Sequence, residues 1–395
     1  MANVTEANIL VGQSGGPTSV INSSLAGVVD RAVADGARVW GMQFGVEGLL
    51  EGSLVELSSL SADDRRALRA TPSSALGSTR KKLADSELAA VLEKLREHDI
   101  RFLFLIGGND TMDTIHRVTA FCRKEGYELV GVGIPKTVDN DLYGTDHTPG
   151  FPSAAWYNVL SVRQAGVLAR DMQRVDQFVV YQTVGRDAGW LAAATACGKR
   201  HPDEAPHLVY VPEAPFDRDE FLQDAEALVA ERGWVSIVCG EGIAYADGTP
   251  VSASTTKDSF DNVEFGAMGG TSAAFALHRI LSQEFGWRGE FQVTESLAMC
   301  AADRAVEGDL EEAYQCGVHA VELAGEGKSG LMVTIEVESR NPYRPQFGTI
   351  PLEDVARRTK AMPQEYIARG SVTDAFLEYM EPLLPRAPRY IRLYE

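Results

Sequence analysis

Short apolar runs alternate along the chain with longer segments in which apolar residues recur with the period of a helix. Each apolar run has the length of a buried strand, and most of them stop at a glycine. The strands expected from this pattern are residues 8–11, 38–42, 101–106, 129–133, 178–182, 207–211, 234–239 and 331–337. The helices expected between them are residues 20–34, 85–97, 111–124, 152–173, 189–197 and 218–232. Strands and helices that alternate in this way are typical of an α/β fold with mainly parallel sheets.

The length and composition of the chain predict two domains. Its 395 residues are 45% hydrophobic and 24% charged, which is enough for two cores of ordinary size. A segment rich in Gly, Pro and Asp, residues 139–152, follows an expected strand and indicates a boundary near residue 150. We therefore expect two three-layer αβα domains of the Rossmann-like kind. Ligands of such sheets bind at the carboxyl ends of the parallel strands, so the motifs that matter should lie there.

The composition also limits the kinds of partner that the protein can bind and the cellular location that is expected for it. No apolar stretch approaches the ~20 residues of a membrane-spanning helix, and the first residues lack the basic and apolar segments of a secretion signal. A cytoplasmic protein that does not enter the membrane is expected. The five cysteines form no C-x-x-C pair, which argues against a disulfide framework and a structural zinc site. A formal charge of −19 opposes binding to nucleic acid. Any phosphate site must therefore use local basic groups and backbone amides.

Two glycine loops each follow an expected strand and precede an expected helix. They read Gly-Gln-Ser-Gly-Gly-Pro-Thr at residues 12–18 and Gly-Gly-Asn-Asp-Thr at residues 107–111. Glycine lets the backbone approach a ligand, and the next helix N-terminus attracts an anion. Asn109 and Asp110 offer oxygen atoms to a hard cation. Turn geometry and helix capping explain the same residues, so neither loop alone establishes a ligand site. Neither has P-loop or G-x-G-x-x-G spacing, which removes most support for a dehydrogenase.

A third loop, residues 133–141, carries more chemistry than a turn requires. Within six positions it places Lys136, Thr137, Asp139 and Asp141. A carboxylate in such a loop can take the proton of an attacking hydroxyl, and a nearby ammonium group can hold a phosphoryl group in transit. A solvated turn would explain the Asp and Asn residues but not their combination with lysine. The loop therefore predicts phosphoryl transfer.

Taken together, these motifs resemble the phosphofructokinase family, and within it the pyrophosphate-dependent 6-phosphofructokinases. The resemblance lies in SGGP at residues 14–17, GGNDT at 107–111 and PKTVDND at 135–141, each after a strand and in this order. It continues through Val-Gly-Arg at 184–186 and Gly-Glu-Gly at 240–242. About the first 245 residues are covered well, and residues 372–376 more loosely.

The resemblance implies an architecture and an activity. It implies a phosphofructokinase-like fold in which residues 1–150 plus about 290–325 bind the phosphoryl donor and residues 151–289 plus about 326–395 bind the acceptor. The implied reaction is reversible transfer of a phosphoryl group from pyrophosphate to fructose 6-phosphate with Mg²⁺, in glycolysis and gluconeogenesis. The implied assembly is a homodimer or a homotetramer.

The resemblance also implies roles for individual residues. Asp139 would deprotonate the C1 hydroxyl of the sugar, and Lys136, Thr137 and Arg186 would complete the catalytic set. The residues implied to contact pyrophosphate are Gly15, Gly16, Arg80, Lys81, Asp110 and Lys136. Those implied to contact the acceptor are Thr137, Asp139, Val184, Gly185, Arg186, Glu241 and Arg288. Those implied to hold the metal are Asn109, Asp110 and Asp141. ATP-using relatives have glycine where this chain has Asp110 and Lys136, so pyrophosphate is the expected donor.

The sequence departs from the family pattern in ways that leave the acceptor open. Asn109 replaces a usual aspartate, and Val184 a usual methionine. The family's Leu-Gln-Arg turn, whose arginine binds the 6-phosphate, is not found at residues 291–299, where one register puts Met299 in its place. A neutral side chain does not replace a bidentate guanidinium group. Arg288, or Arg340 and Arg344, would have to compensate. Two alternatives therefore stay open. One is the same chemistry on sedoheptulose 7-phosphate or inositol, and the other is a weakly active regulatory paralogue.

Overall fold

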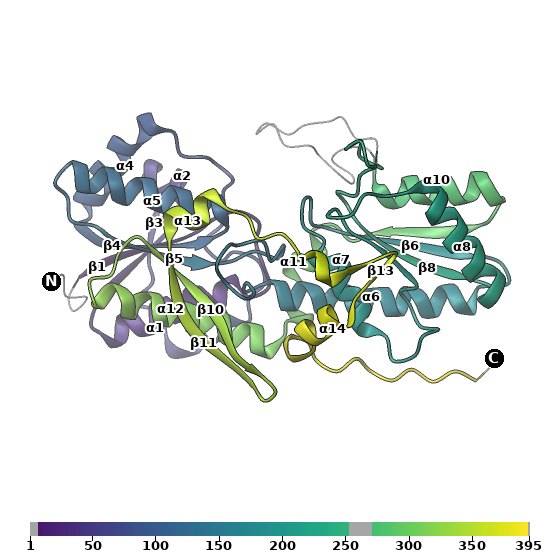
Figure 1. The fold of residues 1–395 in the computed structure, drawn as a ribbon. Coiled ribbons are helices and arrows are strands. Elements are labelled where there is room, and N and C mark those ends of the chain that lie inside the picture. The colour runs from purple at the N-terminus through teal and green to yellow at the C-terminus, as the bar shows by residue number, and fades with distance from the viewer. Residues whose placement is uncertain (1–6, 253–270, 394–395) are drawn as a thin grey trace. The chain divides into compact units, whose positions relative to one another are not determined.

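The chain forms two compact units, and it passes between them three times. The computed structural model describes residues 7–252 and 271–393. Unit 1 contains Met1–Ser153 and Met299–Lys360, and unit 2 contains Ala154–Ala298 and Ala361–Glu395. Each unit has a sheet and helices of its own (Figure 1).

Unit 1 is built on a seven-stranded sheet in the order β11-β10-β5-β4-β1-β2-β3. Neighbouring strands are parallel except at the two edges, where β3 and β11 run antiparallel to their partners. Apolar positions of adjacent strands lie in register, as Val11 does with Phe104. The strands are β1 Asn8–Gln13, β2 Arg38–Met42, β3 Leu54–Glu56, β4 Ile100–Gly107, β5 Val130–Pro135, β10 Leu331–Arg340 and β11 Tyr343–Pro351.

Helices cover both faces of this sheet. One core contains Leu25 of α1 and Ala320 of α12 together with strand residues such as Phe104. The other contains residues of α2, α4, α5 and α13, including Val91 and Ile115. The strands are apolar on both faces because both are covered. The helices are α1 Ile21–Ala34, α2 Gly45–Glu51, α3 Ala62–Arg69, α4 Leu88–Glu97, α5 Asn109–Lys124, α12 Glu307–Gly325 and α13 Leu352–Arg357.

Glycine at one position sets how closely α1 and α12 approach. A Cβ atom on Gly317 would lie 2.1 Å from the backbone oxygen of Ser24. We expect Gly317→Ala to lower the free energy of unfolding by about 1–3 kcal/mol, the usual cost of overpacking, although alanine favours the helix. The matched control is Gly308→Ala in the same helix, where the added Cβ meets no atom within 4 Å. Urea denaturation of both variants measures the difference, and equal stability would contradict this account of the packing.

Unit 2 is built on a parallel four-stranded sheet in the order β7-β8-β6-β9. Helices α8 and α10 pack on one face through residues such as Phe221 and Leu277, and α6 lies on the other (Figure 1). The strands are β6 Phe178–Thr183, β7 Leu208–Tyr210, β8 Val235–Gly240 and β9 Gly289–Val293. The helices are α6 Phe151–Asp171, α7 Trp190–Ala194, α8 Arg218–Arg232, α10 Ala273–Phe285, α11 Leu297–Cys300 and α14 Asp374–Met380, and a small hairpin joins β12 Ile367–Ala368 to β13 Ser371–Val372.

The α/β class and all eight expected strands are confirmed, with ends that differ by up to three residues. Strands β3, β9, β11, β12 and β13 were not expected from the hydrophobic pattern. The division into units differs from the expected domains in two segments. Residues 290–298 belong to unit 2, and residues 326–360 belong to unit 1, because β10 pairs with β5 and β11 pairs with β10. Among the described residues, none of the helices is both long and apolar enough to span a bilayer.

Candidate active site

The three glycine loops come together in unit 1. They follow β1, β4 and β5, which are parallel neighbours in the sheet. Parallel neighbours end at the same edge, so the loops after them are adjacent. Hydrogen bonds join the loops in pairs: Ser14 N donates to Ile106 O at 3.0 Å, and Lys136 N donates to Gly107 O at 3.1 Å. The expected grouping of these motifs is therefore present in the fold.

Lys136 lies at the centre of this group. Its side chain is buried, and Nζ donates to Gly16 O at 2.6 Å. Gly15 has φ +78°, and a Cβ atom there would lie 3.2 Å from Nζ, so glycine provides both the left-handed backbone and the space. Burial lowers the pKa of Lys136 to about 8, although Asp139 and Asp141 favour its charged form. A buried ammonium group against backbone amides is suited to an anion.

The carboxylates of the third loop lie beside this lysine. Asp139 is half-buried, and its N–H donates to Thr137 Oγ1 at 3.1 Å. Burial raises the pKa of Asp141, while the Thr137 hydroxyl and the charge of Lys360 oppose that rise. Asn140, between the two, is fully buried with a left-handed φ of 54°. The loop thus presents two carboxyl groups, Asp139 and Asp141, on one turn, and their surroundings differ.

The basic segment after residue 79 divides between the site and its surroundings. It packs on the first loop, where Gly15 N donates to Thr79 O at 2.9 Å and Ser78 Oγ donates to Gly15 O at 2.5 Å. The charge of Arg80 acts on Lys136 and lowers its pKa. Lys81 instead pairs with Glu87 at 2.7 Å. Arg80 is thus brought to the site, whereas Lys81, also expected there, is engaged elsewhere.

The second loop offers oxygen atoms at the start of α5. The Asp110 carboxylate is exposed and lies 3.7 Å from Lys82 Nζ. Asn109 Nδ2 donates to Arg358 O at 3.2 Å, whereas its Oδ1 is buried and accepts no hydrogen bond from the described residues. A buried oxygen without a donor beside a carboxylate suits a hard cation. Asn109 and Asp110 thus offer oxygen donors of the kind that magnesium prefers, although the described residues contain no group of three or more His, Cys, Asp and Glu side chains placed to hold a metal ion.

In unit 2, the expected acceptor residues gather at the carboxyl ends of β6 and β8. Gly185, with φ 120°, donates its N–H to Glu241 Oε1 at 3.2 Å. Glu241 N in turn donates to Thr183 O at 3.1 Å. Burial raises the pKa of Glu241, and the Gly185 N–H and the charge of Arg186 oppose the rise. Val184, Gly185, Arg186 and Glu241 thus form one group, as expected.

Arg288 does not belong to that group. It directly precedes β9, and β9 runs parallel to β6 with Gly289 opposite Phe178. Arg288 therefore lies at the amino ends of these strands, roughly 16 Å of strand length from the edge that carries Arg186. Its guanidinium group is exposed and lies 3.6 Å from Asp176. The structure therefore does not place Arg288 beside Arg186 and Glu241, and its contact with the acceptor stays a prediction. Arg340 is in unit 1, paired with Asp146 at 2.6 Å.

One residue in contact with the third loop, Lys360, was not predicted from the sequence. Lys360 Nζ donates to Asn140 Oδ1 at 3.1 Å, and burial lowers its pKa to about 7. No glycine motif surrounds Lys360, and it follows Asn140 by 220 positions. A lone lysine in a polar segment has no recognisable pattern, so only the fold could reveal this contact.

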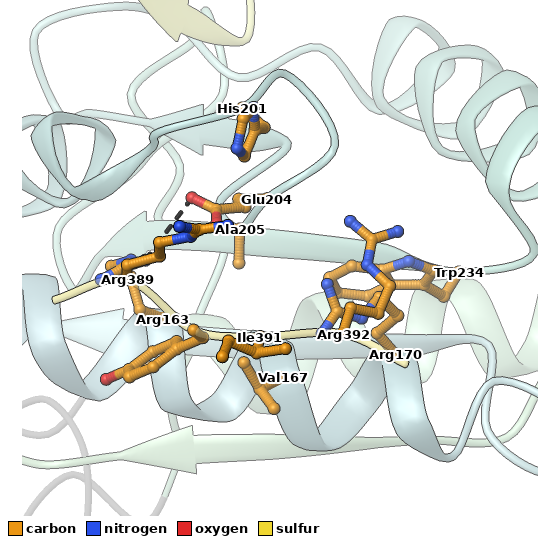
Figure 2. A pocket seen from close by; sticks show the side chains of 12 residues that line it. Arg163, Val167, Arg170, His201, Glu204, Ala205, Trp234, Arg389, Ile391 and Arg392 are labelled. Carbon is orange, nitrogen blue, oxygen red and sulfur yellow. Dashed lines mark ion pairs between the residues drawn. The ribbon is translucent and has the colours of Figure 1, made fainter. Parts of the chain in front are cut away.

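A separate cavity of about 220 Å³ lies within unit 2 and contains none of the motif residues. Figure 2 shows side chains of α6 and of the C-terminal segment around it, among them Arg163, Arg170 and Arg392. Arg163 Nη1 donates to Pro388 O at 2.6 Å, and its guanidinium group lies 4.5 Å from the Tyr390 ring centre. These contacts hold the C-terminal segment along α6.

The sequence and the fold are similar to those of known proteins. Residues 8–324 match the family described as Phosphofructokinase. A pyrophosphate--fructose 6-phosphate 1-phosphotransferase of Xanthomonas campestris pv. campestris is 37% identical over 390 residues, 96% of this chain and 92% of that protein. A sulfofructose kinase of Alkalicoccus urumqiensis is 31% identical over 383 residues, 95% of this chain and 96% of that protein. The solved pyrophosphate-dependent phosphofructokinase from Marinobacter aquaeolei has a TM-score of 0.87 and 34% identity, covering 98% of this chain and 94% of that one. The chain therefore belongs to the phosphofructokinase family.

Proposed function

We propose that this protein transfers a phosphoryl group reversibly from pyrophosphate to the C1 hydroxyl of fructose 6-phosphate, as a cytoplasmic step of glycolysis and gluconeogenesis. Two relatives, at 37% and 36% identity, carry the name of this reaction. Unit 1 is proposed to bind the donor and unit 2 the acceptor, in a homodimer or homotetramer. The proposal rests above all on Lys136, a buried ammonium group held against the first glycine loop at 2.6 Å from Gly16 O.

The chemistry follows from what this loop can do. Asp139 takes the proton of the C1 hydroxyl while the sugar oxygen attacks the near phosphorus of pyrophosphate, and the bond to the bridging oxygen breaks to release phosphate. Lys136 and the amides of the first loop neutralise charge on the transferred group, which is the main requirement of a loose phosphoryl-transfer transition state. Arg186 and Glu241 hold the acceptor. Asn109, Asp110 and Asp141 would hold Mg²⁺, which when bound neutralises phosphate oxygens.

Donor selection follows from the same residues. Inorganic pyrophosphate is small, and Lys136 offers it a charge at short range. The Asp110 side chain stands where ATP-using relatives have glycine, so it repels and obstructs a nucleotide's additional phosphate.

A second candidate function is the same transfer to an acceptor that has another group in place of the 6-phosphate. The observation that favours it is the composition of residues 289–300, which contain no arginine. The name of the sulfofructose kinase described above indicates a sulfonated sugar as the acceptor of that protein. An acceptor without the phosphate would not require the missing guanidinium group.

Turnover with defined donors and acceptors tests both candidates. We expect purified protein with Mg²⁺ to form fructose 1,6-bisphosphate from pyrophosphate and fructose 6-phosphate. The rate with ATP should be less than about 1% of that rate, because the loss of one charge-stabilising interaction lowers a rate by at least about 10²-fold. Product is measured by coupled aldolase and by phosphate release. Turnover only with sulfofructose or inositol, neither of which carries a phosphate, would select the second candidate, and turnover only with sedoheptulose 7-phosphate would contradict both. ATP use equal to pyrophosphate use would contradict the donor assignment.

A further inference from the structure

The segment that follows Asp139 folds around the ammonium group of Lys360. Lys360 Nζ donates to Asn140 Oδ1 at 3.1 Å, to Thr145 O at 3.3 Å and to Asp146 O at 2.8 Å. The backbone N–H of the same lysine donates to Asp141 O at 2.7 Å. Residues 140–146 are therefore held by both the main chain and the side chain of one distant residue.

The number and kind of these contacts match an ammonium group. Three oxygen atoms converge on Nζ, and an ammonium group has three N–H donors and no acceptor. Without a cation, two carbonyl dipoles and an amide oxygen pointing at one spot would repel one another. One water molecule has only two O–H donors and no charge, so it would leave one of the three oxygen atoms without a donor. Lys360 thus supplies the charge that lets the loop close on itself.

Asn140 connects this cation to the two acidic residues of the site. Its φ of 54° is in the left-handed region, which asparagine adopts more readily than most residues. Its Oδ1 accepts from Lys360 Nζ and from Thr148 N, the latter at 3.1 Å. The backbone turn at Asn140 sets the angle between Asp139 and Asp141, and the hydrogen bond from Lys360 Nζ ties its side chain to a cation.

We propose that Lys360 is a positioning residue for phosphoryl transfer: its ammonium group fastens Asn140 and so fixes the direction in which Asp139 presents its carboxylate. The inference rests on the proposed function in taking Asp139 as the base. Lys360 holds the loop from the side of Asn140, and its role is to keep Asp139 in reach of the sugar hydroxyl. Misplacement of a reacting group by about 1 Å costs on the order of 10²-fold in rate.

The first test combines kinetics with chemical rescue. We expect Lys360→Met and Lys360→Ala to lower kcat by about 10²-fold, with KM for pyrophosphate changed by less than about threefold, because geometry and not donor binding is lost. Propylammonium replaces the atoms missing from Lys360→Ala and should restore its kcat at least about tenfold. The control is Val355→Ala, a buried position of α13 whose apolar side chain contributes packing but no hydrogen bond to the loop, and its kcat should be unchanged at temperatures where it is folded.

The second test does not depend on activity. Hydrogen–deuterium exchange should accelerate about tenfold or more in peptides covering residues 139–148 of Lys360→Gln, and not in Val355→Ala, because the loop opens locally. If the wild-type protein shows no turnover, the proposed function fails while this measurement still decides the role of Lys360. Unchanged exchange, or a kcat within about twofold of wild type in Lys360→Met, would overturn the inference.

Discussion

Asp139→Asn is expected to lower kcat for fructose 6-phosphate phosphorylation by about 10²–10⁴-fold, the usual contribution of a general base. Asparagine has the size of aspartate but cannot accept the proton of the C1 hydroxyl. The backbone bond from residue 139 to Thr137 Oγ1 does not involve the carboxylate, so this bond is retained in the variant. Initial rates with saturating pyrophosphate and Mg²⁺ measure the loss, and KM for pyrophosphate should change less than about threefold.

The reverse reaction provides an internal check on this role. A base in one direction is the acid in the other, so transfer from fructose 1,6-bisphosphate to phosphate should fall by the same factor. Asp63→Asn is the matched control, because Asp63 is an exposed residue of α3 paired with Arg66. Wild-type rates in Asp139→Asn, or an equal loss in the control, would remove Asp139 from the mechanism.

Lys136→Met is expected to lower kcat/KM for pyrophosphate by about 10²–10³-fold, the range seen when one preorganised charge-stabilising donor is removed. Methionine fills a similar volume, and it removes the cost of burying a charge. The variant should therefore be as stable as wild type or more stable, which separates loss of chemistry from loss of fold. Lys328→Met is the control, because Lys328 is half-exposed and pairs with Glu326. A stable Lys136→Met enzyme with wild-type kcat/KM would exclude the donor site proposed here.

As the pH rises, deprotonation of the same lysine is expected to lower the activity and to raise the stability of the fold. Burial lowers the pKa of Lys136 from its ordinary 10.5 to about 8, so the ammonium group is lost from the folded protein above that pH. We expect kcat/KM for pyrophosphate to fall above pH 8, and the part of this fall that comes from residue 136 to be absent from the residual activity of Lys136→Met, while the fall due to Lys360, whose pKa is about 7, remains. Between pH 8 and 10.5 the unfolded chain binds more protons at this residue than the folded one, so its contribution to stability rises with pH. A flat wild-type profile up to pH 9.5 would contradict a role for the charged form.

Much of the fold could be predicted because the strands are buried on both faces. Parallel strands covered by helices appear as continuous apolar runs, and all eight expected runs are strands. Strand β11 has exposed residues along its length and lies at a sheet edge, so its pattern resembles a loop. Strand β9 is short and partly exposed. Without these two strands, the sequence pattern assigned residues 290–298 to the first domain and residues 326–360 to the second, whereas the structure has them the other way round.

The sequence by itself determined the parts of the site that lie within one loop. Lys136, Thr137, Asp139 and Asp141 are neighbours along the chain, and β-strand order brings Gly15 and Gly16 to them whenever three such strands pair in parallel. Local sequence fixes such groups because a short loop after a strand has few conformations to choose from. Tertiary structure alone decided which distant charges complete them. Lys81 pairs with Glu87, and Lys360 donates a hydrogen bond to Asn140, which precedes it by 220 positions. Partners of this kind are chosen by burial and charge in the assembled protein, which no local pattern of residues records.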